Sequence, residues 1–265
     1  MNKKPVYAKK SFGQNFLTDG NYINKIVSAL DLQPGETVIE IGAGRGALTE
    51  KLIESGANVV AVELERDMIA VLRREFAGRE NFHLVESDAL KVDFSALSTH
   101  HQAHSTKLVA NLPYYISTAI LQKLIEQREV FGEMILMFQR EVVERITAAV
   151  GNSERGFLTV LTEAYLDAEK LFDVPPNAFL PAPKVQSAVV RLKPKRNIEI
   201  ADDDLFRKIV SEAFRQKRKT ILNNLKNSFA DAEKILAESQ IDARRRAESL
   251  TLEDWLRLAE RVAEN

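Results

Sequence analysis

Five short apolar runs recur along the first part of the chain, separated by stretches of mixed polarity. They lie at residues 37–41, 58–62, 82–85, 107–110 and 133–138. In three of the intervening stretches apolar residues recur every three or four positions, as in amphipathic helices, at 47–55, 66–76 and 117–127. Strands that are apolar almost throughout and alternate with helices are typical of a parallel sheet buried on both faces. We therefore predict an α/β fold.

The character of the chain changes toward its C-terminus. A proline-rich loop leads into one more strand-like segment, 185–192. After Pro194 only helical patterns follow, and residues 251–254 (Thr-Leu-Glu-Asp) approximate the capping box that opens a helix. We expect a sheet-containing domain over 1–195 and a small all-helical domain over 196–265.

The composition excludes several classes of protein. The 265 residues include no cysteine, which rules out a disulfide scaffold, a Cys-ligated zinc site and a thiol nucleophile. No apolar run approaches the ~20 residues of a membrane span, and the N-terminus lacks the apolar segment of a signal peptide. We expect a cytoplasmic protein without a membrane partner.

The net charge of -1 conceals an uneven distribution. Residues 191–226 carry eleven Lys or Arg against five acids, a net of +6, so the remainder of the chain carries -7. The first ten residues add four lysines and no acid. The densest basic run contains Arg215, Lys217, Arg218 and Lys219. It is either an ordinary solvated face or a strip that binds nucleic-acid phosphates.

A glycine-rich loop follows the first apolar run. Residues 40–46 read Glu-Ile-Gly-Ala-Gly-Arg-Gly and stand between a predicted strand and a predicted helix, where Gly42 and Gly44 allow a tight turn and close approach of a ligand. Glu63 ends the next predicted strand about twenty residues on, where an acid usually takes ribose hydroxyls. The loop and this acid predict a nucleotide site, but they suit a dinucleotide and S-adenosylmethionine (SAM) equally.

Ser87-Asp88-Ala89, after the third run, bears on that choice. An aspartate there can accept a hydrogen bond from an adenine amino group, as in a SAM site. Alternatively, Asp88 is a turn or cap residue.

Asn111-Leu112-Pro113-Tyr114 follows the fourth run, at the edge where α/β sheets place their ligands. Its chemistry suits methylation of an exocyclic amine, a poor nucleophile because its lone pair is delocalised into the ring. The Asn111 side-chain carbonyl and a backbone carbonyl near Leu112 would hold the amino hydrogens and direct the lone pair at a methyl sulfonium. Pro113 would stiffen the loop, and Tyr114 offers a face for base stacking. The alternative is an ordinary strand-to-helix loop.

Together these two motifs resemble the SAM-dependent ribosomal RNA adenine N6-dimethyltransferases. Residues 10–17 (Lys-Ser-Phe-Gly-Gln-Asn-Phe-Leu), 179–187 (Phe-Leu-Pro-Ala-Pro-Lys-Val-Gln-Ser) and the basic run at 215–219 also resemble motifs of that family. The resemblance covers essentially the whole chain in the same order. It is greater to the branch that modifies small-subunit (16S) rRNA than to the large-subunit enzymes of macrolide resistance.

The resemblance implies a Rossmann-like sheet of seven mostly parallel strands with a helical C-terminal domain that binds RNA or the ribosome. It implies SAM-dependent dimethylation of N6 of two adjacent adenines in the 3′-terminal hairpin of 16S rRNA, within assembling small subunits. We expect a monomer whose partner is the small subunit or its precursor, with a role in ribosome biogenesis.

The resemblance also assigns residues. Those implied for the cofactor are Asn15, Leu17, Gly42, Gly44, Glu63, Leu64, Asp88, Ala89 and Asn111. The residues implied for catalysis are Asn111, Leu112, Pro113, Tyr114 and Phe179. Of these, Tyr114 and Phe179 would sandwich the extruded base. From the residues alone, Phe179 reads equally well as a core anchor. Those implied for RNA binding are Arg215, Lys217, Arg218 and Lys219.

Two other functions and one other site need consideration. A ribosome-assembly factor without catalysis would keep the fold and the SAM site, and a nicotinamide-dependent oxidoreductase would use the same glycine loop. The intact Asn111–Tyr114 motif argues against the assembly factor. His100, His101 and His104 lie in a loop extension, and we expect no metal site there because no acidic partner completes it.

Overall fold

The computed structural model describes residues 15–98 and 106–264. The chain forms two compact units, of which the first extends to Val143 and takes in Ala168–Pro194. The second comprises Glu144–Asp167 and the residues from Lys195 onward. The predicted domain boundary near residue 195 coincides with one of the points at which the chain passes from one unit to the other. Residues 144–167, predicted to belong to the sheet domain, group instead with the C-terminal helices.

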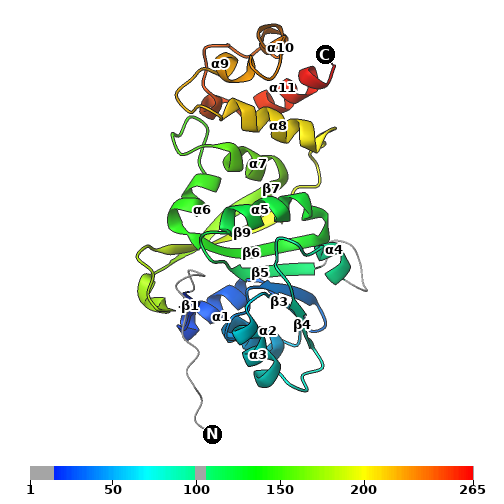
Figure 1. Cartoon of the computed structure of the whole chain (residues 1–265), viewed down its shortest axis with the longest axis vertical. Helices are drawn as coiled ribbons and strands as arrows, with labels where there is room; N and C mark the ends of the chain where they lie inside the picture. The colour runs from blue at the N-terminus through cyan, green and yellow to red at the C-terminus, as the bar shows by residue number, and fades with distance from the viewer. Residues whose placement is uncertain (1–14, 99–105, 265) are drawn as a thin grey trace. The chain divides into compact units, whose positions relative to one another are not determined.

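A seven-stranded sheet is the framework of the first unit (Figure 1), with the order β4-β3-β2-β5-β6-β9-β7. The pairs from β4 to β6 are parallel, and β9 runs antiparallel to β6. The strands are β2 (Thr37–Ile41), β3 (Asn58–Glu63), β4 (Phe82–Glu86), β5 (Thr106–Asn111), β6 (Phe131–Gln139), β7 (Leu166–Val174) and β9 (Ser187–Pro194). The predicted mostly parallel α/β sheet is confirmed.

Helices cover both faces of this sheet. Figure 1 shows α1 and α2 on one side of β5 and β6, with α5 on the other. The helices of this unit are α1 (Gly20–Ala29), α2 (Ala47–Glu54), α3 (Arg66–Glu75), α4 (Phe94–Leu97) and α5 (Ser117–Glu126), and α6 (Arg140–Ile146) begins in it. Because both faces are covered, the central strands are buried and almost wholly apolar, as the sequence indicated.

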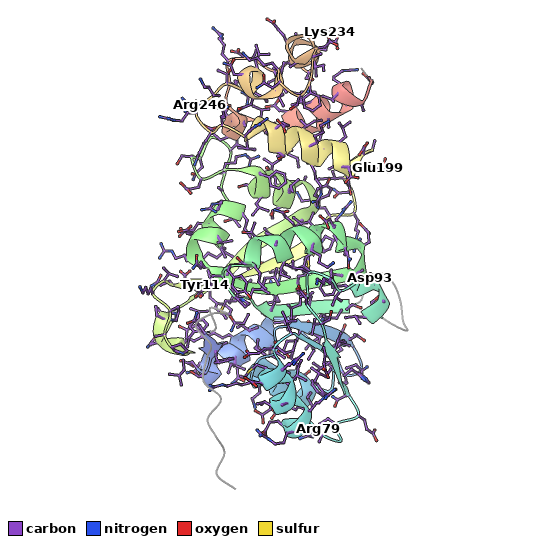
Figure 2. All side chains as sticks on the ribbon, in the orientation of Figure 1. Arg79, Asp93, Tyr114, Glu199, Lys234 and Arg246 are labelled. Carbon is purple, nitrogen blue, oxygen red and sulfur yellow. The ribbon has the colours of Figure 1, made fainter. Side chains whose placement is uncertain are left out.

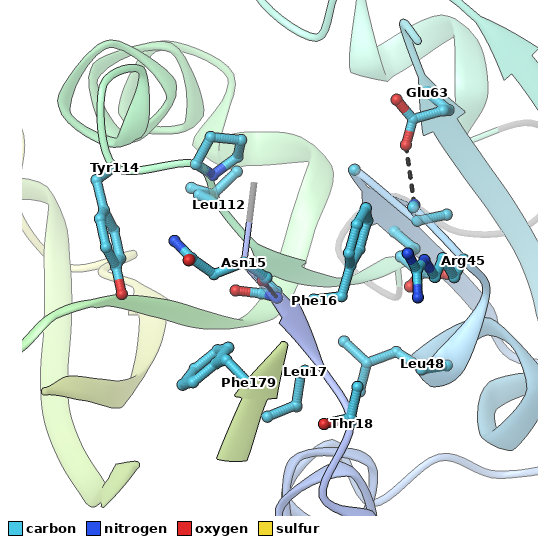
Figure 3. A pocket seen from close by; sticks show the side chains of 17 residues that line it. Asn15, Phe16, Leu17, Thr18, Arg45, Leu48, Glu63, Leu112, Tyr114 and Phe179 are labelled. Carbon is cyan, nitrogen blue, oxygen red and sulfur yellow. Dashed lines mark hydrogen bonds between the residues drawn. The ribbon is translucent and has the colours of Figure 1, made fainter. Parts of the chain in front are cut away.

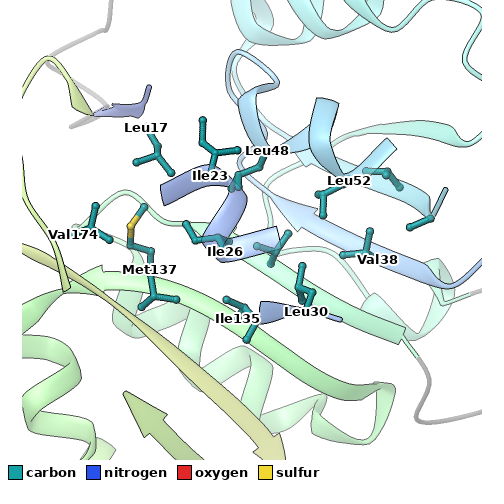
Figure 4. Close-up of a cluster of buried hydrophobic side chains, with 14 of the residues drawn as sticks. Leu17, Ile23, Ile26, Leu30, Val38, Leu48, Leu52, Ile135, Met137 and Val174 are labelled. Atoms are coloured by element: carbon teal, nitrogen blue, oxygen red, sulfur yellow. The ribbon is translucent and has the colours of Figure 1, made fainter. Parts of the chain in front are cut away.

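One core cluster ties α1 and α2 to the sheet (Figure 4). Ile26 of α1 and Leu30, directly after that helix, are at most 2% exposed, and Leu52 on α2 is fully buried in the same cluster. Burial of each such side chain contributes roughly 1.5–3 kcal/mol. The same cluster contains Leu17 and Phe179, which belong to a separate two-stranded sheet of β1 (Phe16–Leu17) and β8 (Phe179–Leu180). The core therefore anchors residues expected to hold the ligands.

The strand register brings the motifs to one edge. Ile41 of β2 is opposite Val62 of β3 and Ala110 of β5. The residues that follow them, Gly42, Glu63 and Asn111, therefore lie side by side at the carboxyl edge of the sheet. The sequence motifs that begin at these three positions meet there, although 69 residues separate Gly42 from Asn111.

The second unit is helical except for the start of β7. Its helices after the end of α6 are α7 (Phe157–Tyr165), α8 (Asp203–Ala213), α9 (Ile221–Leu225), α10 (Ala232–Glu238) and α11 (Leu252–Glu264). Trp255 is fully buried and stacks on Phe214 with ring centroids 5.8 Å apart. The predicted capping box is confirmed, because Thr251 Oγ1 accepts from the Asp254 amide and Asp254 Oδ2 accepts from the Thr251 amide.

Residues 144–167 join this unit because α7 packs against α8 and α11. The Tyr165 ring lies 6.0 Å from the Phe206 ring, edge-on. Arg155, 2% exposed, forms an ion pair with Glu163 and donates to the Leu250 carbonyl. Among the residues that the structure describes, no helix is both long and apolar enough to cross a membrane.

Candidate active site

A pocket opens at the carboxyl edge of the sheet (Figure 3). Its walls come from the glycine loop after β2, the loop after β5, and the β1–β8 pair. In Figure 2, Tyr114 and Asp93 lie at opposite ends of β5 and β6, and of the two only Tyr114 lines the pocket. The residues of the predicted site that line the pocket are Asn15, Leu17, Gly42, Gly44, Glu63, Asn111, Leu112, Pro113, Tyr114 and Phe179.

The glycine loop has the backbone conformation expected of it. Gly44 has a φ of 56°, which side chains rarely tolerate, and a Cβ there would lie 3.2 Å from the Phe16 ring. Gly46 precedes α2 with a φ of 84°, and a Cβ there would lie 2.6 Å from the Phe76 ring. Glycine is therefore required at both positions, at the first to line the pocket closely and at the second to pack α2 against α3.

Glu63 is an anchored carboxylate at the end of β3. It is 8% exposed and accepts hydrogen bonds from the amides of Gly44, Leu64 and Glu65, each at 2.9 Å. Three amide donors hold this carboxylate in a fixed position. Its Oε2 faces the glycine loop across the pocket wall (Figure 3), which suits an acceptor for the hydroxyls of a bound ribose.

Three predicted cofactor residues do not line this pocket: Leu64, Asp88 and Ala89. They follow β3 and β4, which end side by side with Glu63 opposite Glu86. Asp88 Oδ1 accepts from the Leu90 amide at 3.0 Å, and its carbonyl accepts from the Lys91 amide. Asp88 thus has the turn role that the sequence left open.

The loop after β5 presents the motif to the pocket. Asn111 Nδ2 donates to the Asn15 carbonyl at 3.4 Å, which orients the amide and leaves its Oδ1 as an acceptor. Leu112 is buried at 2% exposure. The Ile116 amide donates to the Pro113 carbonyl at 3.2 Å, so residues 113–116 form a β-turn. This turn places Tyr114 at the pocket.

Tyr114 and Phe179 both border the pocket, in different environments. The Tyr114 hydroxyl lies 3.0 Å from Ser187 Oγ, and partial burial raises the pKa of the phenol, an effect that the Ser187 hydrogen bond opposes. Phe179 is 4% exposed and belongs to the core cluster, opposite Leu17 in the β1–β8 pair. Phe179 is therefore a core anchor that also lines the pocket, so the two readings of this residue are compatible.

Sequence reasoning gave no role to several residues that line the pocket. Glu40, within the glycine motif, is 2% exposed, and Thr49 donates to its Oε2 at 2.5 Å. Burial raises the pKa of Glu40 to about 7. The Arg45 guanidinium stacks on the Phe16 ring, 4.4 Å from its centroid. The signal that could have identified Glu40 and Arg45 was a charged residue at each end of the otherwise apolar stretch 40–45.

The side chains of the pocket suit a ligand that carries both cationic groups and a carboxylate. Two acids, Glu40 and Glu63, and one cation, Arg45, line it. SAM carries a sulfonium, an ammonium and a carboxylate, and the Gly44 backbone leaves no room for a side chain beside it. The residues present therefore fit SAM.

The basic residues predicted to bind RNA lie elsewhere, in the second unit. Arg215, Lys217, Arg218 and Lys219, here called the basic strip, are exposed between α8 and α9. Arg215 lies 3.5 Å from Glu212. The lysines of the first ten residues and His100, His101 and His104 lie outside the described residues. Within the described part of the chain, no group of acids or histidines could hold a metal ion.

Comparison with known proteins decides what kind of enzyme this pocket serves. The family model for ribosomal RNA adenine dimethylase matches residues 6–264. The chain belongs to this family. It is a SAM-dependent rRNA adenine dimethyltransferase.

Individual relatives agree with the family assignment. Ribosomal RNA small subunit methyltransferase A of Saccharophagus degradans is 44% identical over 95% of this chain and 93% of its own length. A dimethyladenosine transferase structure from Plasmodium falciparum has 28% identity and a TM-score of 0.77, covering 92% of this chain and 95% of that one. The 23S rRNA methyltransferase ErmE has 25% identity and a TM-score of 0.70, covering 94% of this chain and 100% of its own.

Proposed function

We propose that this dimethyltransferase acts on N6 of two adjacent adenines in the 3′-terminal hairpin of 16S rRNA. Its substrate would be the small ribosomal subunit or its precursor, and the chain would act as a monomer. The choice of the small subunit is supported by a relative named as a small-subunit methyltransferase, 44% identical over nearly the full length. The structural match named for 23S rRNA is less similar, at 25% identity.

The observation that carries the proposed chemistry is the orientation of Asn111. Its amide NH2 group donates to the Asn15 carbonyl, so its Oδ1 is the acceptor that remains for an adenine amino hydrogen. The backbone carbonyl of Leu112 would take the second hydrogen. Two acceptors on one amine favour a tetrahedral nitrogen whose lone pair points away from the ring, which raises its nucleophilicity.

When bound, SAM supplies a methyl group from its sulfonium, which becomes a neutral sulfide. The nitrogen that gains the methyl group turns acidic as the bond forms and releases its proton to water. Since the leaving group is good, the chain has only to position the amine and the cofactor, and such positioning supplies much of the catalysis. Glu63 would accept the ribose hydroxyls, and Asn15 and Leu17 would hold the methionine end beside Gly42 and Gly44. Asp88, with Leu64 and Ala89, would bind the adenine of the cofactor.

The target base would leave its stack and enter between Tyr114 and Phe179. Stacking on an aromatic face contributes roughly 1–3 kcal/mol per base, which offsets part of the cost of extrusion. The bond from Tyr114 to Ser187 fixes one ring, and burial in the core fixes the other. In the helical domain proposed over residues 196–265, the basic strip would bind rRNA phosphates.

The decisive experiment uses small subunits that lack these methyl groups, incubated with labelled SAM. Mass mapping of the rRNA should find dimethyladenine at two adjacent positions of the 3′-terminal hairpin. Asn111→Ala should lower the single-turnover rate by ~100-fold or more, because one acceptor of the amine is lost. Asn24→Ala, at an exposed asparagine of α1 that does not line the pocket, is the matched control and should retain the normal rate.

Three outcomes would count against the proposal. Label in another RNA or at another position would refute the target. A normal rate in Asn111→Ala would refute the catalytic assignment. Normal binding of subunits with no methylation by the wild-type chain would favour an assembly factor instead.

A further inference from the structure

Most of the exposed large apolar side chains lie at the carboxyl edge of the sheet, the edge at which the pocket opens. Among the described residues, the large hydrophobic side chains that are exposed are Leu64, Leu90, Tyr115, Val150, Leu180 and Val185. All but Val150 lie on loops or short strands at the carboxyl edge of the sheet. The loop that ends at Ser187 belongs to this edge, because Ser187 is opposite Gln139, the last residue of β6. Exposed apolar groups that cluster beside a pocket mark a binding surface.

Tyr115 is the most exposed of these, at 62%. It occupies the second corner of the β-turn over residues 113–116, directly after Tyr114. The two tyrosines differ in environment, since Tyr114 is half-buried at the pocket with its hydroxyl on Ser187. The turn therefore holds one aromatic ring at the pocket and presents the next to solvent.

Cations border the same surface. Lys184 is exposed on the loop between β8 and β9. Arg140, exposed at the end of β6, donates from its side chain to Gln186 Oε1 at 3.0 Å and from its amide to the Gln186 carbonyl at 2.9 Å. An exposed aromatic ring with cations nearby is the combination that binds single-stranded nucleic acid, by stacking on bases and pairing with phosphates.

We propose that Tyr115 is a positioning residue that stacks on the base next to the target adenine along the RNA strand. This inference rests on the proposed function, in which the neighbouring base is the second adenine. With one adenine at Tyr114 and its neighbour held on Tyr115, the chain would accept the two adenines one at a time. Lys184, exposed on the loop that ends at Ser187 beside Tyr114, would neutralise the backbone of the same nucleotides.

The test is a cycle between the side chain and the base that it would contact. Two RNA hairpins are compared, one with two adjacent loop adenines and one with an abasic nucleotide in place of the neighbour. Binding is measured by fluorescence anisotropy with S-adenosylhomocysteine present, so that no turnover occurs. Wild type and Tyr115→Phe both carry a ring that can stack on the neighbouring base. Each should therefore lose ~10-fold in affinity when that base is removed from the RNA. Tyr115→Ala should bind both RNAs equally weakly.

Val150→Ala is the matched control, because Val150 is also an exposed apolar residue but belongs to the second unit and not to the carboxyl edge of the sheet. It should discriminate between the two RNAs as wild type does. If Tyr115→Ala still discriminated, or if Tyr115→Phe did not, the stacking role would be refuted.

A second measurement uses under-methylated small subunits. Tyr115→Ala should raise the subunit concentration that gives half the maximal rate by ~10-fold, with Tyr115→Phe restoring it. A lower maximal rate with unchanged half-saturation would refute positioning of substrate and indicate damage to the catalytic loop. The outcomes are separable from failure of the proposed function, which would show as an absence of dimethyladenine in wild type.

Discussion

At the scale of single residues, the most consequential group that sequence reasoning passed over is Glu40. It is a carboxyl group with 2% exposure, and burial raises its pKa from 4.5 to about 7. The nearby charge of Glu63 acts in the same direction, and the Thr49 hydroxyl opposes both. The folded protein therefore holds a proton on Glu40 over a pH range in which the unfolded chain has lost it.

This difference predicts how stability depends on pH. Between pH 4.5 and about 7 the folded state binds more protons at Glu40 than the unfolded state does, so this group's contribution to the free energy of unfolding falls as pH rises. The total loss is roughly 3 kcal/mol and is complete above about pH 7. Glu40→Gln cannot ionise and keeps an acceptor for Thr49, so it should lack this loss and be the more stable protein at pH 8.

Urea denaturation at pH 5 and pH 8 measures the effect. Glu80→Gln, at an exposed position, is the control and should follow the wild-type pH dependence. Equal pH dependence of Glu40→Gln and wild type would show that Glu40 does not titrate in this range.

At the scale of elements, whether a strand or helix can be predicted from the sequence depends on the pattern of buried and exposed residues along it. The five apolar runs correspond to β2–β6. In β2, β3, β5 and β6 the run reflects burial on both faces, whereas β4 is an edge strand that is only partly buried. β7 was not predicted, since only its two ends are buried and the residues between alternate in polarity without a continuous apolar run. α7 was not predicted either; it is buried on nearly every side, so it lacks the exposed polar face that reveals a surface helix.

The candidate site shows the same division. Glu63 and Asn111 could be placed from sequence because each ends a recognisable strand, and parallel strands end at one edge. The pairing of Leu17 with Phe179 could not, because two-residue strands 162 positions apart carry no pattern of their own. Leu17 and Phe179 were assigned from the family resemblance alone, and their pairing follows from tertiary packing.

The joint between β2 and α2 permits a prediction about packing. Gly46→Ala places a Cβ 2.6 Å from the Phe76 ring at a φ of 84°. The left-handed conformation and the overpacking together should destabilise the fold by about 2–4 kcal/mol, measured by urea denaturation. Gly20→Ala is the control: no atom lies within 4 Å of its Cβ, and it begins α1, so it should be neutral or slightly stabilising. An equal effect of both substitutions would contradict the packing argument.

At the scale of the whole molecule, a net charge of -1 is compatible with an rRNA substrate because the charge is unevenly distributed. Residues 191–226 carry a net +6, and their densest part, the basic strip, is exposed in the second unit. The pocket in the first unit has two acids and one cation instead. Binding of the cofactor and binding of the RNA backbone therefore depend on different charges.

Neutralising all four residues of the basic strip with glutamine should consequently weaken binding to small subunits while leaving the Kd for SAM unchanged. Each phosphate contact that is lost should reduce the slope of log K against log salt by about 0.7–0.9, because fewer counterions are released. Titrations at several salt concentrations measure that slope, and calorimetry with SAM checks the pocket.

A control variant neutralises four exposed cations of the first unit, Arg73, Arg74, Arg79 and Lys91, with the same change in net charge. If the strip and control variants flattened the slope equally, total charge rather than the strip would govern binding; an unchanged slope in the strip variant would make the strip a solvated face.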